Sequence, residues 1–175
     1  MERVSNINIR AIEPEDLDWL YGIENDAELW DIGQTNVPYS RYSLHRYLSE
    51  TSSDIYADKQ LRLIIETKKE KKAVGIIDLM NFEPRHQRAE IGVVIAKPYR
   101  HNGYAREALR QTIEYSRSII HLNQIYAFVG EQNQASRQLF ESMNFQQTTC
   151  LKQWLRTEEG YEDVVVYQLF FIKNT

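Results

Sequence analysis

The residues best suited to chemistry lie in a short polar loop at positions 100–103, Arg-His-Asn-Gly. This loop joins an apolar, strand-like run at 91–96 to a strongly helical run that begins at Tyr104. Loop and first-turn N–H groups at a helix start have no partner within the helix, and the helix dipole favours negative charge there. The pattern therefore predicts that this loop holds a phosphate group.

The elements that position the loop can be read from hydrophobic periodicity and turn residues. Helices are expected from Pro14, from an N-cap at Ser40, over 104–119 and over 133–143. A lysine-rich stretch at 68–72 is expected to be a solvated hairpin tip. Strands are expected at residues 6–11, 60–67, 73–82, 88–96, 124–129, 147–157 and 161–171.

The order of these elements predicts a fold of the α/β (α+β) class. The first strand stands alone, a meander follows, and the later strands alternate with two helices, which favours a mixed sheet with helices on both faces. The length of 175 residues is that of a single domain, here 1–175.

The composition narrows the function classes. A net charge of -4 argues against a nucleic-acid-binding surface. The single cysteine, Cys150, excludes a disulfide within one chain and suits a reducing compartment. The first residues lack the apolar core of a signal peptide, and no apolar run approaches membrane-spanning length, so we expect a cytoplasmic protein without a membrane partner.

Two motifs carry a family resemblance. Residues 100–105, Arg-His-Asn-Gly-Tyr-Ala, resemble the Gln/Arg-x-x-Gly-x-Gly/Ala signature of the GNAT N-acetyltransferase superfamily. Residues 133–145, with Asn133, Ser136, the Leu-Phe-Glu at 139–141 and Asn144-Phe145, resemble the Asn-led helix of the same superfamily. The order of elements also matches. The nearest branch is that of spermidine/diamine and ribosomal-protein N-acetyltransferases.

The resemblance implies a GNAT-like, mostly antiparallel, twisted sheet of about seven strands. It also implies acetyl-CoA as co-substrate. The strand before the loop is expected to hold the pantetheine arm through its backbone, and the loop to hold the pyrophosphate, with charge added by Arg100 or Arg106. The implied CoA-binding residues are Val93, Val94, Ile95, Arg100, His101, Asn102, Gly103, Tyr104, Ala105, Arg106, Asn133, Ser136 and Arg137.

Acetyl transfer to an amine needs a base, because an ammonium ion has no lone pair. Glu90, at the start of the CoA-facing strand, is the first candidate, and Asp78 on the preceding strand is the second. The backbone N–H near Val94 or Ile95 is the expected donor to the thioester oxygen. A salt-bridged or solvated role at the strand end is the competing interpretation of Glu90.

The general acid departs from the family pattern. Phe140 stands where members commonly have a tyrosine, and it has no proton to give to the leaving thiolate. Three interpretations stay open. The thiolate leaves without enzymic help, another hydroxyl such as Tyr104, Ser136 or Tyr161 substitutes, or the protein binds acyl-CoA with little turnover. Core packing explains Phe140 itself.

The acceptor site is expected between the 25–39 segment, the turn after Phe82 and the last hairpin near Tyr161. Acidic residues within and just before the first segment, together with Trp30, could receive a cationic amine; the acidic residues are Glu24, Asp26, Glu28 and Asp31. An ordinary acidic helix end and loop is the competing interpretation. The four histidines lack metal-ligand spacing, so no metal site is expected.

The sequence therefore predicts transfer of an acetyl group from acetyl-CoA to a primary amine, such as a small polyamine, by direct attack in a ternary complex. N-terminal acetylation of a ribosomal or other protein is the alternative within the enzyme class. A non-catalytic acyl-CoA-binding domain is the alternative outside it. A homodimer is an open expectation.

Overall fold

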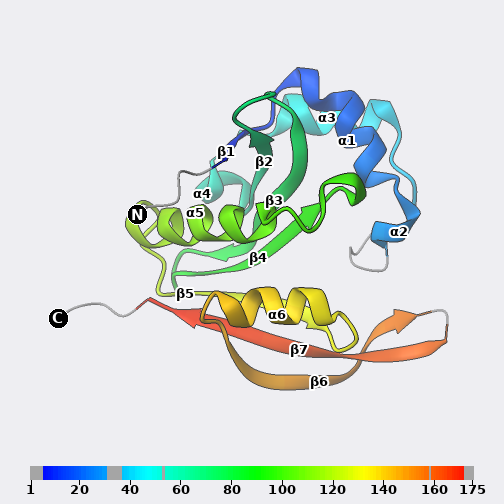
Figure 1. Ribbon diagram of the computed structural model, residues 1–175. Helices are drawn as coiled ribbons and strands as arrows, with labels where there is room; N and C mark the ends of the chain where they lie inside the picture. Colours follow the sequence, from blue (N-terminus) through cyan, green and yellow to red (C-terminus); the bar gives the residue numbers. More distant parts are fainter. Residues whose placement is uncertain (1–5, 31–36, 53, 158, 172–175) are drawn as a thin grey trace.

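The computed structural model describes residues 6–30, 37–52, 54–157 and 159–171. One seven-stranded sheet, in the order β1-β2-β3-β4-β5-β7-β6, organises these residues (Figure 1). The strands are β1 (Ile7–Ala11), β2 (Leu61–Thr67), β3 (Ala73–Glu83), β4 (Arg88–Ile95), β5 (Gln124–Gly130), β6 (Gln146–Thr157) and β7 (Gly160–Phe170). The predicted mixed, mostly antiparallel sheet is confirmed, because only β4 and β5 pair in parallel.

The helices cover both faces of the sheet, as predicted. They are α1 (Leu17–Glu24), α2 (Ala27–Trp30), α3 (Arg41–Glu50), α4 (Ile55–Asp58), α5 (Tyr104–Ser118) and α6 (Gln134–Ser142), with 3-10 turns η1 (Pro14–Asp16) and η2 (Lys97–Tyr99). α5 and α6 share one core with the sheet through Ala108, Leu109 and Phe140. α1 packs Leu20 and Ile23 in a second, smaller core against Ile64 and Ile76 on the opposite face.

Local chemistry explains where the helices begin. The Ser40 hydroxyl accepts the Ser43 N–H at 3.0 Å, so Ser40 caps α3 as predicted. The short helices α2 and α4 were not predicted, because four residues show no helical period. Asp31, one of the proposed acidic acceptor residues, lies outside the described residues. No described helix is long and apolar enough to cross a membrane.

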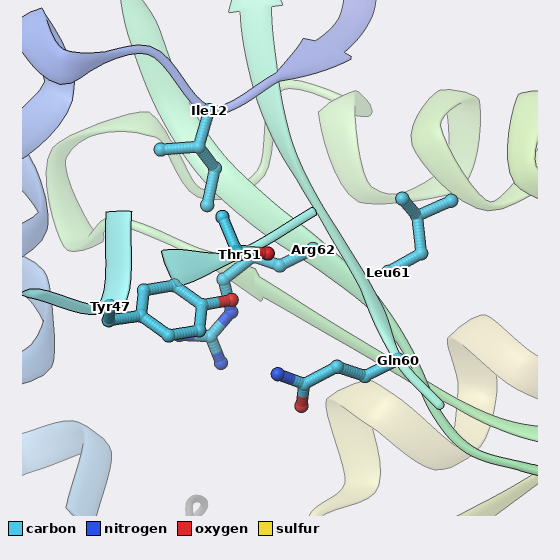
Figure 2. A pocket seen from close by; sticks show the side chains of 6 residues that line it. All are labelled: Ile12, Tyr47, Thr51, Gln60, Leu61 and Arg62. Atoms are coloured by element: carbon cyan, nitrogen blue, oxygen red, sulfur yellow. The ribbon is translucent and has the colours of Figure 1, made fainter. Parts of the chain in front are cut away.

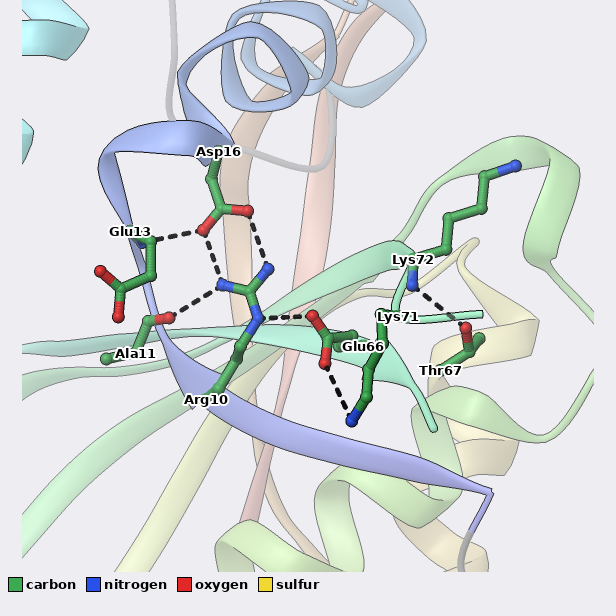
Figure 3. Close-up of polar contacts among 8 residues, drawn as sticks. All are labelled: Arg10, Ala11, Glu13, Asp16, Glu66, Thr67, Lys71 and Lys72. Atoms are coloured by element: carbon green, nitrogen blue, oxygen red, sulfur yellow. Dashed lines mark hydrogen bonds and ion pairs between the residues drawn. The ribbon is translucent and has the colours of Figure 1, made fainter. Parts of the chain in front are cut away.

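A partly buried network of ion pairs joins the first strand to the neighbouring part of the sheet (Figure 3). The Arg10 guanidinium donates to both Asp16 oxygens, at 2.7 and 2.9 Å, and to Glu66 at 2.7 Å. Burial of the Asp16 carboxyl opposes its ionisation, but the hydrogen bonds from Arg10 and the Glu13 N–H outweigh burial and lower the Asp16 pKa. This network ties β1, η1 and β2 together.

Gly75 allows β3 to approach the end of β4. A Cβ at position 75 would stand 2.7 Å from Ile95 Cδ1 and still closer to the Val94 carbonyl oxygen. We therefore expect Gly75→Ala to displace β4 and to lower the free energy of unfolding by about 1–3 kcal/mol. Because the resemblance assigns the pantetheine arm to this strand, we also expect the variant to raise the KM for acetyl-CoA.

Thermal unfolding and steady-state kinetics check this prediction. Gly22→Ala is the matched control, because a Cβ at position 22 on α1 meets no atom within 4 Å. Alanine there should instead stabilise the helix by about 0.5–1 kcal/mol. If Gly75→Ala melts like the wild type and keeps its acetyl-CoA KM, the close approach does not shape the strand that the resemblance assigns to pantetheine.

Candidate active site

The candidate site opens where β4 and β5 part. The two strands pair only from Arg88–Gln124 to Glu90–Tyr126, although β4 continues to Ile95 and β5 to Gly130. Beyond the Glu90–Tyr126 rung, a cleft of about 320 Å³ lies between the end of β4 and the first turns of α5 and α6. A cleft of this size is typical of small-molecule sites.

The cleft collects most of the residues proposed for CoA. It is lined by Leu29, Val93, Val94, Ile95, Tyr99, Arg100, His101, Gly103, Tyr104, Ala105, Arg106, Asn133, Ala135, Ser136 and Leu139. Of the proposed residues only Asn102 and Arg137 are not among them. Tyr99 and Leu139 were missed in the sequence. Ala135 is exposed and also lines the cleft.

The backbone of β4 offers alternating amides to the cleft. Ala96 donates its N–H to Val74 of β3, and amide direction alternates along an antiparallel strand. Val94 therefore turns its N–H towards β3, whereas Val93 and Ile95 turn theirs towards the cleft. Between the two proposed oxyanion donors, this register favours Ile95.

The loop after β4 is shaped for an anion. His101 and Gly103 both have left-handed backbone, with φ of 63° and 78°. The Asn102 side chain donates to the Tyr99 and Arg100 carbonyls, and Arg100 Nε donates to the Ile95 carbonyl at 3.1 Å. Turns of this kind direct successive N–H groups into one concavity at the helix start.

The Asn-led helix has a structural cap. The Asn133 side chain accepts the Ser136 N–H at 3.1 Å and so begins α6 beside the cleft. Arg137 instead directs its guanidinium to the Glu131 carbonyl and the Tyr167 hydroxyl. Its proposed contact with CoA would need these bonds to be exchanged.

Glu90 is a buried carboxyl on the last paired rung of β4 and β5, and it does not line the cleft itself. It is 8% exposed, and Asn81 donates an amide hydrogen to its Oε2 at 2.8 Å. Burial raises the pKa of the Glu90 carboxyl, and the Asn81 hydrogen bond only partly offsets this. A raised carboxyl pKa suits a general base near neutral pH.

Asn81 is the partner that sequence reasoning missed. It lies where the β3–β4 register shifts, between Met80 and Glu83, with φ of 50°. Asparagine tolerates this left-handed conformation better than most residues. The bulge places the Asn81 amide over Glu90.

Asp78, the second candidate base, is held by an ion pair. Arg62 donates to both Asp78 oxygens, at 2.7 and 3.2 Å, and to Glu24 at 2.5 Å. Figure 2 shows Arg62, Tyr47 and Gln60 around a small pocket. The pocket has a volume of about 10 Å³, which leaves room for little more than one water molecule. The geometry therefore favours Glu90 as the base.

Comparisons with known proteins agree with this geometry. A family model described as "Acetyltransferase (GNAT) domain" matches residues 6–146. The chain belongs to the GNAT acetyltransferase family. As a member of this family, the protein is an N-acetyltransferase that uses acetyl-CoA as its co-substrate.

Curated relatives cover nearly the whole acetyltransferase chain. The spermidine N(1)-acetyltransferase of Vibrio cholerae is 24% identical over 91% of this chain and 90% of its own length. The putative ribosomal N-acetyltransferase YdaF of Bacillus subtilis is 25% identical over 94% and 91%. A structure of the Vibrio cholerae enzyme with CoA and spermine has a TM-score of 0.85, at 24% identity, covering 95% of this chain and 96% of that one.

The cleft of the acetyltransferase fits a CoA thioester. Val93, Ile95 and Leu139 offer an apolar wall for the pantetheine arm. A Cβ placed on Gly103 would meet no atom within 4 Å, so there is open space beside the loop at this position.

Phe140 has the packing role that its side chain predicts. It is 4% exposed, with its ring edge-on to Phe145 at 5.0 Å and stacked with Tyr167 at 6.2 Å. Tyr104 and Ser136, two of the hydroxyls considered as substitutes, line the cleft. Tyr161 does not line it, and is 67% exposed near the end of the β6–β7 hairpin.

The acidic residues proposed for the acceptor are already partnered. Glu24 pairs with Arg62, Glu28 pairs with Lys97 at 2.6 Å, and Asp26 accepts the Glu28 N–H at 3.1 Å. The Lys97 contact lowers the pKa of the Glu28 carboxyl. A cationic acceptor would have to compete with Arg62 and Lys97 for these carboxylates.

One group of metal-ligand types occurs in the described chain. Glu131, Cys150 and Asp163 bring their ligand atoms within 4.8 Å of one another. The Lys152 ammonium pairs with Asp163 at 2.6 Å, and Asp163 also accepts the Gln153 N–H at 2.8 Å. The Lys152 ammonium thus already supplies a positive charge at the position where these three side chains would attract a cation.

Proposed function

We propose that this acetyltransferase transfers acetyl groups to a primary amine of a small polyamine, by direct attack in a ternary complex. The observation that carries the proposal is the Glu90 carboxyl, buried with a raised pKa at the rung where β4 and β5 part. The similarity to spermidine N(1)-acetyltransferases supports the choice of acceptor.

The chemistry follows from the groups at this rung. Acetyl-CoA supplies an activated acetyl thioester. The Glu90 carboxylate takes a proton from the acceptor ammonium, directly or through a water, so that the nitrogen lone pair is free. The N–C bond then forms, while the Ile95 N–H donates to the acetyl oxygen as negative charge develops. The C–S bond breaks, and the extra proton on the acylated nitrogen passes through water to the departing thiolate, which leaves a neutral amide and CoA thiol.

No side chain is assigned as the proton donor to the leaving thiolate. We propose unassisted or water-assisted departure, because a thiol is a good leaving group and Phe140 has no proton to give. Tyr104 and Ser136 stay as candidate donors on the cleft wall.

Phe140→Tyr tests this assignment. A general acid contributes roughly 10²- to 10⁴-fold, so a large gain in kcat would show that protonation of the thiolate limits the wild type. We expect no gain in kcat and a lower melting temperature, because the new hydroxyl enters a packed core and costs about 1–3 kcal/mol if it finds no partner. Phe145→Tyr, in the same cluster, is the control for burial of a hydroxyl.

Thiol release from acetyl-CoA with a panel of amines tests the function. Release with spermidine or spermine, but not with peptides that have a free N-terminus, supports the proposal. Preference for peptides would favour N-terminal acetylation, for which the similarity to YdaF speaks. Tight CoA binding without release above background would show a non-catalytic acyl-CoA-binding domain.

Self-association is a further proposal. A dodecameric structure is described for the Vibrio cholerae relative. We expect this chain to form homo-oligomers, the homodimer being the smallest, which light scattering in solution can measure.

A further inference from the structure

Three aromatic side chains form a continuous wall beside Glu90, on the face of the sheet that faces away from α6. Tyr126 is the register partner of Glu90, and its ring meets Phe128 edge-on at 5.6 Å. Trp154 reaches across from β6 and stacks on Phe128 at 6.4 Å with an interplanar angle of 16°. We call Tyr126, Phe128 and Trp154 the aromatic wall.

The wall faces solvent. Phe128 is 40% and Trp154 is 58% exposed, whereas Ala127 and Val129, which alternate with them on β5, are buried in the core under α5 and α6. On the wall's own face, the described helix residues Leu20, Ile23 and Leu29 pack with Ile64 of β2 and Ile76 of β3. Large exposed aromatic surfaces of this kind mark binding sites.

A bulge in β6 accounts for the exposed position of Trp154. The β6–β7 register shifts between Leu151 and Leu155, and Gln153 has left-handed backbone with φ of 52°. Asp163 accepts the Gln153 N–H at 2.8 Å and so anchors this bulge. Bulges re-aim side chains, and here the bulge immediately precedes Trp154.

The wall and Glu90 together match a cationic ligand. Aromatic faces attract ammonium groups, and Glu90 supplies a carboxylate at one end of the row. Arg88, two rungs from Glu90 on the side away from the wall, repels cations from that direction. A chain with one ammonium at Glu90 would therefore extend its second ammonium along Phe128 towards Trp154.

We propose that the aromatic wall binds the distal ammonium and methylene groups of an alkyl polyamine whose reacting amine lies at Glu90. This inference rests on the proposed function and deepens it, because it names the residues that select a polyamine over a monoamine. The selection follows from cation–π attraction at Phe128 and Trp154, which a neutral alkyl tail lacks.

Trp154→Ala tests the wall, with kinetics for spermidine and for n-butylamine. We expect the KM for spermidine to rise about 3- to 30-fold, with the KM for acetyl-CoA and the kcat/KM for n-butylamine unchanged. Trp154→Phe should recover most of the loss. Phe170→Ala is the matched control, because Phe170 is 48% exposed and pairs with Gln124, on the Arg88 side of Glu90.

Three results would contradict the proposed role of the aromatic wall in polyamine binding. Equal loss for spermidine and n-butylamine would show a general effect on the site. A spermidine KM that does not change would show that the wall makes no contact. Light scattering that finds an oligomer dissociated by Trp154→Ala would show that a second copy of the chain covers the wall.

A failure of the proposed function is separable from a failure of the wall. If the wild type acetylates no amine, calorimetric titration of spermidine into the CoA-saturated protein still measures how tightly the aromatic wall binds a polyamine. Weaker binding to Trp154→Ala than to Phe170→Ala would then support it, and equal binding would refute it.

Discussion

Glu90→Gln is expected to lower kcat/KM for amine acetylation by about 10²- to 10⁴-fold while leaving the melting temperature equal to or above that of the wild type. Burial raises the pKa of Glu90, so the native protein holds a proton on this group more tightly than the unfolded chain does. The stability linked to Glu90 is full below the unfolded-state pKa and is lost as pH rises through the folded-state pKa. A neutral glutamine removes that loss at neutral pH.

The pH profile of the same variant separates catalysis from packing. In the wild type, kcat/KM should fall as pH drops through the raised pKa of Glu90, because only the carboxylate accepts a proton. In Glu90→Gln this acid limb should disappear. The remaining rate should rise with pH as free amine accumulates, so the two proteins differ least at high pH.

Asn81→Gly is the companion variant, because glycine keeps the left-handed backbone at φ of 50° and removes only the amide. The Asn81 hydrogen bond lowers the Glu90 pKa, so its loss should move the acid limb to higher pH. If Glu90→Gln keeps the wild-type pH–rate profile, or if Asn81→Gly leaves the limb in place, Glu90 is not the base.

Gly103→Val is expected to weaken CoA binding by about 10-fold or more, since a β-branched residue at φ of 78° costs about 1–3 kcal/mol of backbone strain. The new side chain would also enter the open side of the loop, where the N–H groups face the cleft. Isothermal titration with CoA measures the loss directly.

Two controls separate strain from loss of the phosphate site. His101→Gly should keep or improve CoA affinity, because glycine relieves the left-handed backbone at position 101 and retains the N–H. Gly160→Val places similar strain in the β6–β7 hairpin, at φ of 136°, and should lower stability without changing CoA affinity. Unchanged CoA affinity in Gly103→Val would refute the loop assignment.

The parts of the site that were predictable from the sequence are those encoded locally. The loop at 100–103, the capping Asn133 and Glu90 lie within single strand-to-helix or cap patterns, so their residue types and spacing are visible in one short stretch. Asn144, which ends the Asn-led motif, has left-handed backbone with φ of 65°, a conformation that asparagine tolerates better than most residues.

The rest of the site depends on register between strands, which periodicity does not report. Asn81 reaches Glu90 only because a bulge shifts β3 against β4. Asp78 is held by Arg62 on β2, and Trp154 crosses from β6 to Phe128 on β5. Each of these contacts joins residues that lie far apart in the chain or in different strands, so no local pattern predicted them.

The most direct test of the account is a structure of the protein with CoA bound. The account predicts the pyrophosphate on the N–H groups of residues 100–105, and the sulfur between β4 and β5 beyond the Glu90–Tyr126 rung, within reach of Glu90 directly or through one water. A bound CoA whose pyrophosphate avoids this loop, or whose sulfur lies away from Glu90, would contradict it.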